Sequence, residues 1–329
     1  MTGLVIRTTG SWYRVLPLDS TLPINVTGDT SAAAVVDCRL RGNYRLRGNK
    51  QTNPVAVGDH VEYTLQEDGT GVISEVADRR NYIVRRATKL SKQTHVIAAN
   101  IDRLCIVASL AAPRTTTGFI DRLLVTAEAY HIPACILFNK ADIYDDVLRA
   151  EYAELEAIYR GAGYPVYLLS ALEGTGIEGL RHDLAGQTVL FSGHSGVGKS
   201  ALLNAIAPDL NLRVGDISDW SLKGKHTTTF AEIHPLQLGV HGGTPLLSYL
   251  IDTPGIKEFG MVDIQPAELC HFFPEMRRVL HDCHFANCTH RHEPHCAVKE
   301  ALERGDISAE RYKNYLGIYD QIVSGNEPW

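Results

Sequence analysis

The segment GHSGVGKS at residues 193–200 has the residue types and spacing of a loop that binds phosphate groups. Its glycines let the backbone curl with the amides inward, Lys199 can reach terminal phosphates, and the Ser200 hydroxyl can ligate Mg²⁺. An apolar run at 188–191 precedes it and a helical run at 201–206 follows, as such a loop requires. A glycine-rich turn that carries Lys and Ser by chance is the alternative. The residues expected around the nucleotide phosphates are Gly193, His194, Ser195, Gly196, Val197, Gly198, Lys199, Ser200 and Ala201.

Two short motifs upstream follow predicted strands and can recognise a base. Asn139, Lys140, Ala141 and Asp142 come directly after the apolar run 134–138, and Ser170 and Ala171 follow the run 165–169. The first motif resembles the NKxD element of GTPases, in which the Asp carboxylate accepts hydrogen bonds from the N1–H and 2-amino groups of guanine. The second resembles the SA element, whose backbone amide contacts the guanine carbonyl. The alternative for Asp142 is a helix N-cap. The strand-end positions favour guanine recognition.

Downstream of the loop, Asp252 to Gly255 (DTPG) ends another predicted strand and fits the DxxG element. There Asp252 would hold Mg²⁺ through water and the Gly255 amide would meet the γ-phosphate. Thr228, in the polar segment 223–229, is the candidate Mg²⁺ ligand of a switch loop, although its three consecutive threonines could equally begin a strand. Ile256 stands where many GTPases carry the water-orienting Gln, so we expect slow intrinsic hydrolysis. His226 is the candidate replacement, with a solvated loop histidine as the alternative. Lys199, Thr228 and His226 are thus the candidate catalytic residues.

A third cluster lies near the C-terminus and has the composition of a metal site. Cys283, Cys288, His290 and Cys296 fall within fourteen residues and form a complete tetrahedral Cys₃His set for one structural Zn²⁺. The nitrogen ligand has alternatives, because other histidines lie close by in the sequence. The alternative nitrogen donors are His281, His284, His292 and His295.

Composition sets broad limits on the class of protein. The 329 residues, 44% apolar and 21% charged, are typical of a globular protein of two or three domains. We find neither a signal peptide nor a run of eighteen apolar residues, which predicts a cytoplasmic protein that does not enter a membrane. Four further cysteines are scattered in apolar surroundings typical of reduced core thiols. Residues 1–93 hold 13 basic and 9 acidic residues, a net charge of +4 in a chain of net charge −6, so this end is the candidate for contacting a polyanion.

The first 85 residues predict a small β-barrel of the OB-fold type, from about five short β-branched or aromatic runs separated by turn signals. Within it, residues 39–50 place four arginines and a lysine around Tyr44, a pattern that could bind single-stranded RNA or form a solvated strand face. The basic stretch 79–94 is interpreted as a linker. From residue 100 the pattern alternates between strands and helices, which predicts a parallel sheet wrapped by helices with its ligands at the carboxyl ends of the strands.

The order of the motifs indicates a circular permutation. In ordinary GTPases the phosphate loop comes first, whereas here the NKxD and SA motifs precede it and the DxxG motif follows. Ligand-binding loops keep their places in space when only the chain ends move. We therefore expect a multidomain α/β protein: an OB-like RNA-binding barrel with a basic linker (1–93), a circularly permuted P-loop GTPase domain (94–262) and a C-terminal zinc-binding α-helical domain (263–329). Helices are expected at 298–304 and 308–323, the second with a core-packing stripe of Tyr312, Leu316, Tyr319 and Val323.

The permuted order, the basic barrel before it and the cysteine spacing after it make the chain resemble the RsgA (YjeQ) family of bacterial GTPases over nearly its whole length. The resemblance implies a late assembly factor of the small ribosomal subunit that contacts rRNA and leaves after subunit-stimulated GTP hydrolysis. The family is also similar in having a hydrophobic residue at the position of Ile256 and a switch-loop histidine, here His226, proposed as catalytic. Two small departures are Ala201, where many members have a second Ser, and Ala141 inside NKxD.

Two other functions are consistent with the sequence. A GTP-gated RNA-binding protein or chaperone would show incidental turnover that small subunits leave unchanged. An adenine-nucleotide enzyme would not depend on Asp142 for its choice of base. We expect a monomer that binds GTP or GDP with Mg²⁺.

Overall fold

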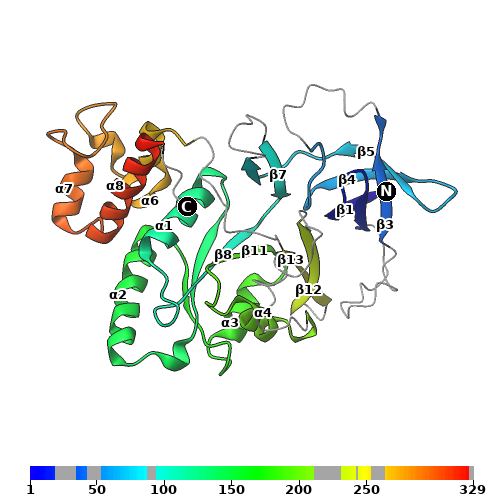
Figure 1. Cartoon of the computed structure of the whole chain (residues 1–329), viewed down its shortest axis with the longest axis horizontal. Coiled ribbons are helices and arrows are strands. Elements are labelled where there is room, and N and C mark those ends of the chain that lie inside the picture. The colour runs from blue at the N-terminus through cyan, green and yellow to red at the C-terminus, as the bar shows by residue number, and fades with distance from the viewer. Residues whose placement is uncertain are drawn as a thin grey trace.

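The computed structural model describes residues 1–18, 35–42, 53–86, 94–210, 231–241, 244–252 and 264–325. Three parts lie in a row in Figure 1: strands of the N-terminal barrel, a sheet flanked by helices, and a C-terminal group of helices. Among the described helices, none combines the length and apolar character needed to cross a membrane.

The N-terminal part is a β-barrel, as expected. Its strands are β1 (Thr2–Thr8), β2 (Tyr13–Pro17), β3 (Val36–Leu40), β4 (His60–Leu65) and β5 (Gly71–Val76). Within the described ranges they follow the order β1-β2-β3-β5-β4, and β4 pairs back to β1 to close the barrel. Alternating apolar residues fill its interior, since successive side chains of a strand point to opposite faces; Val5, Tyr63 and Ile73 are among the most deeply buried.

The linker expected at 79–94 is wrong in part, because residues 82–86 and residue 94 belong to a β-ribbon. Strand β6 (Tyr82–Arg86) pairs antiparallel with β7 (Thr94–Ala99). Ahead of it, the Arg79 guanidinium donates to both carboxylate oxygens of Asp59 at 2.7 and 2.8 Å, and Asp59 is fully buried. The charge that suggested a solvated linker thus pairs with a buried carboxylate of the barrel.

The central part is a mostly parallel sheet. Its elements are β8 (Arg103–Ala108), α1 (Thr117–Ala129), β9 (Ala134–Phe138), the 3₁₀ helix η2 (Ala141–Ile143), α2 (Asp146–Ala162), β10 (Val166–Leu168), α3 (Ile177–Leu184), β11 (Thr188–Ser192), α4 (Lys199–Ile206), the 3₁₀ helix η3 (Pro208–Leu210), β12 (Glu232–His241) and β13 (Thr244–Asp252). The strand order is β10-β9-β8-β11-β13-β12, with β12 antiparallel to β13. The sheet continues into the barrel through one antiparallel bridge between Arg7 and Glu232.

Both faces of this sheet are covered, which explains its continuous apolar strands. On β8, Ile106 faces a core shared with α1 and α2, whereas its neighbours Cys105 and Val107 face a core shared with α3 and α4. The strands therefore form the middle layer of three. Their carboxyl ends lead into the motifs singled out in the sequence.

The C-terminal part is helical and packs on α1 (Figure 1). It contains the 3₁₀ helices η5 (Pro266–Phe272) and η6 (Leu280–Asp282) and the α-helices α6 (Pro274–Arg277), α7 (Ala297–Arg304) and α8 (Ala309–Ser324). The stripe expected on α8 is displaced by one position. Of the expected stripe, Tyr312, Leu316 and Tyr319 are only partly buried at the edge of the core, and Val323 is exposed. The buried residues of α8 are Tyr315, Ile318 and the charged Arg311.

We expect the Arg79–Asp59 pair to matter far more for stability than the neighbouring Arg80–Asp102 pair. Removing Arg79 leaves a fully buried carboxylate uncompensated, which costs about 3–5 kcal/mol. Arg80 is 63% exposed in its 2.8 Å pair with Asp102, so solvent screens that contact and its loss should cost less than about 1 kcal/mol. Urea unfolding of Arg79→Ala and Arg80→Ala measures the difference; equal losses would contradict the assignment.

Candidate nucleotide and metal sites

The phosphate-loop motif follows β11 and leads into α4, as the sequence predicts. Gly198 precedes the helix with φ +91°, and Gly193 and Gly196 also have positive φ, a conformation that glycine adopts without steric cost. Space is limiting as well. A Cβ on Gly198 would lie 2.5 Å from Asn139 Nδ2, and one on Gly193 would overlap the carbonyl of Val107. Glycine is therefore required here both by conformation and by close approach.

The two polar side chains of this loop lie at the start of α4. The Lys199 ammonium donates to the carbonyl oxygens of Gly193 and His194, both at 2.7 Å, and so lies across the loop. Ser200 is buried in the first turn of the helix. Helix N-termini attract anions because their first amides have no partner within the helix. The arrangement combines a positive side chain, the amides of a helix N-terminus and a hydroxyl at one point.

The NKAD and SA motifs lie beside each other at the ends of neighbouring strands β9 and β10. The Ser170 hydroxyl donates to Asp142 Oδ1 at 2.6 Å, and the Ala171 amide donates to Asn139 Oδ1 at 3.2 Å. Asp142 lies inside η2, while Asp145 caps α2 by accepting from the Leu148 amide. The alternative of Asp142 as a helix N-cap therefore does not describe this site.

Asn139 also joins the base motifs to the phosphate loop. Its Nδ2 donates to the carbonyl oxygen of Val197 at 3.0 Å, and its side chain is buried. Lys140 has φ +68°, and its ammonium donates to the Ala112 carbonyl at 2.6 Å. Three loops that are separate in sequence thus meet around one amide side chain.

The remaining switch residues are only partly described. The backbone of Asp252 ends β13, which lies next to β11 in the sheet. The expected positions of His226, Thr228, Gly255 and Ile256 lie outside the described residues. Their roles therefore stay predictions.

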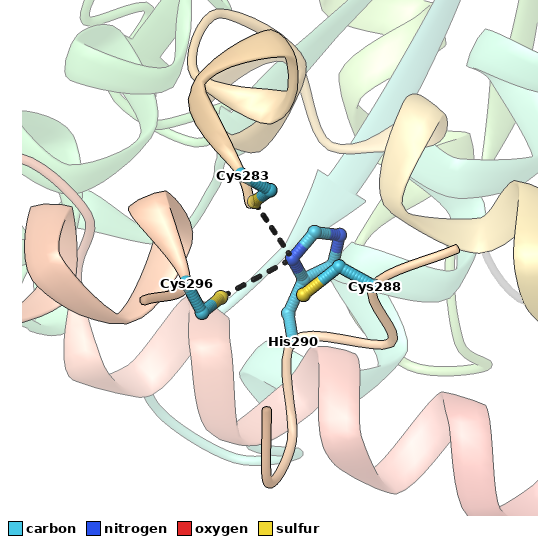
Figure 2. Close-up of side chains that lie close together, drawn as sticks. All are labelled: Cys283, Cys288, His290 and Cys296. Carbon is cyan, nitrogen blue, oxygen red and sulfur yellow. Dashed lines mark hydrogen bonds between the residues drawn. The ribbon is translucent and has the colours of Figure 1, made fainter. Parts of the chain in front are cut away.

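Figure 2 shows the three cysteines of the C-terminal cluster pointing toward the His290 ring. The ligand atoms of Cys283, Cys288, His290 and Cys296 all lie within 4.8 Å of one another. His290 Nδ1 is 3.6 Å from Cys283 Sγ and 3.4 Å from Cys296 Sγ. Tetrahedral zinc, with bonds of about 2.3 Å to sulfur and about 2.0 Å to nitrogen, separates such atoms by roughly 3.5 Å. The donor set therefore fits Zn²⁺, with His290 as the nitrogen donor among the five nearby histidines.

The loop that carries His290 is braced by hydrogen bonds. The Tyr312 and Tyr315 hydroxyls of α8 donate to the carbonyl oxygens of His290 and Thr289 at 2.7 and 2.9 Å. Glu293 accepts from the amide and hydroxyl of Thr289, and these bonds outweigh its partial burial and lower the pKa of its carboxyl. Two tyrosines of α8, Tyr312 from the expected stripe and Tyr315 from the buried face, thus support the metal loop.

Sequence reasoning missed several residues that hold the nucleotide loops. The Tyr144 hydroxyl donates to the Asn139 carbonyl and accepts from the Leu110 amide, both at 2.9 Å. The Phe119 ring stacks on that of His194, with centroids 3.6 Å apart. Burial, aided by nearby Lys199, lowers the pKa of His194 and favours its neutral form. Neither aromatic residue belongs to a recognisable motif, so only the fold reveals them.

Substituting Gly198 should weaken nucleotide binding. A Cβ there clashes with Asn139 and needs a left-handed backbone, so Gly198→Ala should lower guanine-nucleotide affinity at least about tenfold. Gly186 is the matched control, because it has φ +77° at the opposite end of β11 and open space around it. Calorimetric titration with GDP compares the two variants. Unchanged affinity in Gly198→Ala would contradict the assignment.

We expect one zinc per chain, lost when Cys288 becomes Ala. Metal analysis of the purified protein measures this, and the thermal midpoint should fall with the metal because binding stabilises only the folded loop. Cys270→Ala serves as control, since Cys270 is a buried thiol of the same core outside the cluster. A folded parent protein without metal would refute the site.

Comparison with known proteins agrees with this geometry. The family model "RsgA N-terminal domain" matches residues 2–73, and "RsgA GTPase" matches residues 76–262. The chain is 46% identical over 325 residues to the Small ribosomal subunit biogenesis GTPase RsgA of Bacteroides fragilis, covering 99% of this chain and 98% of the relative. It is 44% identical to the protein of that name from Flavobacterium psychrophilum, covering 97% and 93%.

Solved structures agree over the same length. The crystal structure of YjeQ from Thermotoga maritima matches with a TM-score of 0.76 and 34% identity, covering 98% of each chain. That of YloQ, described as a circularly permuted GTPase, matches with a TM-score of 0.71 and 30% identity, covering 100% of this chain and 96% of the other. With its permuted order of motifs and its assembled nucleotide loops, the chain belongs to the RsgA family of GTPases.

Proposed function

We propose that this protein hydrolyses GTP as a late assembly factor of the small ribosomal subunit and is released from the subunit on hydrolysis. Its relatives are named as small ribosomal subunit biogenesis GTPases. The observation that carries the nucleotide part is the Asn139 side chain, which joins the NKAD, SA and phosphate loops. The guanine-recognition motifs and the phosphate loop can then engage one nucleotide.

The residues divide the chemistry among them. Asp142, oriented by the Ser170 hydroxyl, would accept hydrogen bonds from the guanine ring. The loop amides and Lys199 would hold the phosphates, and Ser200 would hold Mg²⁺ together with Thr228 and Asp252. Mg²⁺, when bound, neutralises charge that develops on the phosphates. Gly255 would contact the γ-phosphate, and His226 would position the attacking water in place of the Gln that Ile256 replaces.

The flanking parts would contact rRNA. On the barrel, the exposed Arg39 guanidinium lies 4.0 Å from the ring centroid of Trp12, so a cation and an aromatic ring adjoin on the surface. Such pairs can contact phosphates and stack on bases. Zn²⁺ held by the Cys₃His cluster would be structural, because four protein donors leave no open position. We further propose a cytoplasmic monomer.

The GTPase function is tested by measuring hydrolysis with and without purified small ribosomal subunits. We expect slow basal turnover that subunits stimulate. An unchanged rate would overturn the proposal and favour a GTP-gated RNA-binding protein, whose RNA affinity would differ between the GTP and GDP states.

Base choice is tested with Asp142→Asn. An amide accepts only one of the two guanine hydrogen bonds and loses the charge, so GTP affinity should fall about 10- to 100-fold. Affinity for a xanthosine nucleotide, which carries a carbonyl in place of the 2-amino group, should rise. Ser170→Ala removes the hydrogen bond that orients Asp142, together with the one that the Ser170 hydroxyl accepts from the Glu173 amide, but leaves the carboxylate in place and should have a smaller effect. If Asp142→Asn leaves nucleotide choice unaltered, an adenine-nucleotide enzyme becomes the better explanation.

A further inference from the structure

One continuous segment, residues 107–119, lies along the phosphate loop. Gly193 lies against the Val107 carbonyl, a Cβ on Gly196 would be 3.2 Å from the Pro113 ring, and the His194 ring stacks on Phe119. Since the phosphate loop curls at Gly193, His194 and Gly196, segment 107–119 shapes the path of the loop backbone. Of the three contact residues in the segment, Phe119 comes last in the sequence, and it is the one that lies inside α1.

The Phe119–His194 contact is specific in geometry. The ring centroids are 3.6 Å apart with an interplanar angle of 30°, which is a stacked arrangement. The backbone of His194 is held separately, because its carbonyl accepts from Lys199. With its ring and carbonyl both held, His194 sets the direction in which the loop turns between Gly193 and Gly196.

Helix α1 is fixed on its other side by the C-terminal helices. Asp121 lies two residues after Phe119, roughly 200° around the helix. Arg311 of α8 donates to Asp121 Oδ1 at 2.6 Å and to both oxygens of Glu275 at 2.7 and 3.1 Å, and Asn314 donates to Asp121 Oδ2 at 2.6 Å. Asp121, Glu275 and Arg311 are all buried.

The charge state of this network favours tight docking. Burial would lower the pKa of Arg311, but Asp121 and Glu275 outweigh it and raise that pKa. Burial raises the pKa of the Asp121 carboxyl, even though Arg311 and Asn314 oppose that rise. The bidentate contact with Glu275 and the short contact with Asp121 both require a charged guanidinium, in keeping with the raised pKa of Arg311. Thr117 adds a hydroxyl contact to Glu310 at 2.7 Å.

We propose that Phe119 is a positioning residue for the phosphate loop and that the C-terminal helices, through the Arg311–Asp121 contact, hold it there. Nucleotide affinity then depends on how those helices dock on α1. The link runs from His194 to Phe119 by ring stacking, from Phe119 to Asp121 through the backbone of α1, and from Asp121 to Arg311 by a hydrogen bond. A partner that moves the C-terminal helices would thereby alter nucleotide binding. The inference rests on the proposed nucleotide site.

The first experiment measures GDP and GTP-analogue affinity of the full-length Phe119→Ala protein. An aromatic pair contributes roughly three- to tenfold in an equilibrium constant, so affinity should fall by about that factor, and Phe119→Tyr, which keeps the ring, should restore it. Tyr82→Ala is the matched control, because Tyr82 contacts Tyr130 at the opposite end of α1. An equal loss in Tyr82→Ala, or no loss in Phe119→Ala, would overturn the proposal.

The second experiment is a double-mutant cycle with Arg311→Lys, which keeps the charge and loses the forked contact. We expect affinity to fall about two- to fivefold when Phe119 is present and to change little in the Phe119→Ala background. Additive effects would exclude the link. Should Arg311→Lys not fold, Asn314→Ala takes its place, since it removes only one hydrogen bond to Asp121.

The two proposals fail differently. A parent protein that binds no guanine nucleotide overturns the proposed function and this inference together. A parent that binds nucleotide while Phe119→Ala binds it equally well overturns the inference alone.

Discussion

One buried amide, the side chain of Asn139, holds the nucleotide loops together. It donates to the phosphate loop at Val197 and accepts from the Ala171 amide, so the loops after β9, β10 and β11 meet around it. A buried amide must satisfy its donor and acceptor, and here both partners are backbone groups of other loops. Gly198 must lack a side chain for Asn139 to reach them. The contacts of Asn139 therefore both fix the position of the base motifs and require glycine at position 198.

The parallel sheet makes this meeting possible in a permuted chain. Binding loops lie at the carboxyl ends of parallel strands, and the strand order β10-β9-β8-β11-β13 places the relevant ends side by side whichever strand comes first in sequence. Permutation changes only where the chain enters and leaves. The barrel precedes the sheet and continues it through the bridge to β12, and the helical module follows β13.

The C-terminal module is organised by two kinds of bonding. A Cys₃His cluster that could hold one metal ion lies in its loop, and the buried Arg311 network attaches its helices to α1. A buried ion pair is costly to desolvate and is strongly destabilising when one partner is lost, so it specifies a single docking arrangement. Helix α1 also carries Phe119, which stacks on His194 of the phosphate loop. The C-terminal helices and the phosphate loop therefore contact the same helix from different sides.

Much of the site was predictable from spacing along the chain. The phosphate loop, the guanine motifs and the cysteine cluster are local patterns whose chemistry follows from residue types a few positions apart, and the alternation of runs indicated a barrel followed by a layered sheet. Other features depend on contacts between distant segments. Arg311 is buried because Asp121 lies beside it from 190 positions away, which local polarity misplaces on the surface. For the same reason residues 82–86 pair with a strand further along the chain, and Phe119 meets His194 only once the tertiary structure has brought their segments together. The choice of His290 among five histidines depends on the folded path of its own loop, which spacing alone leaves open.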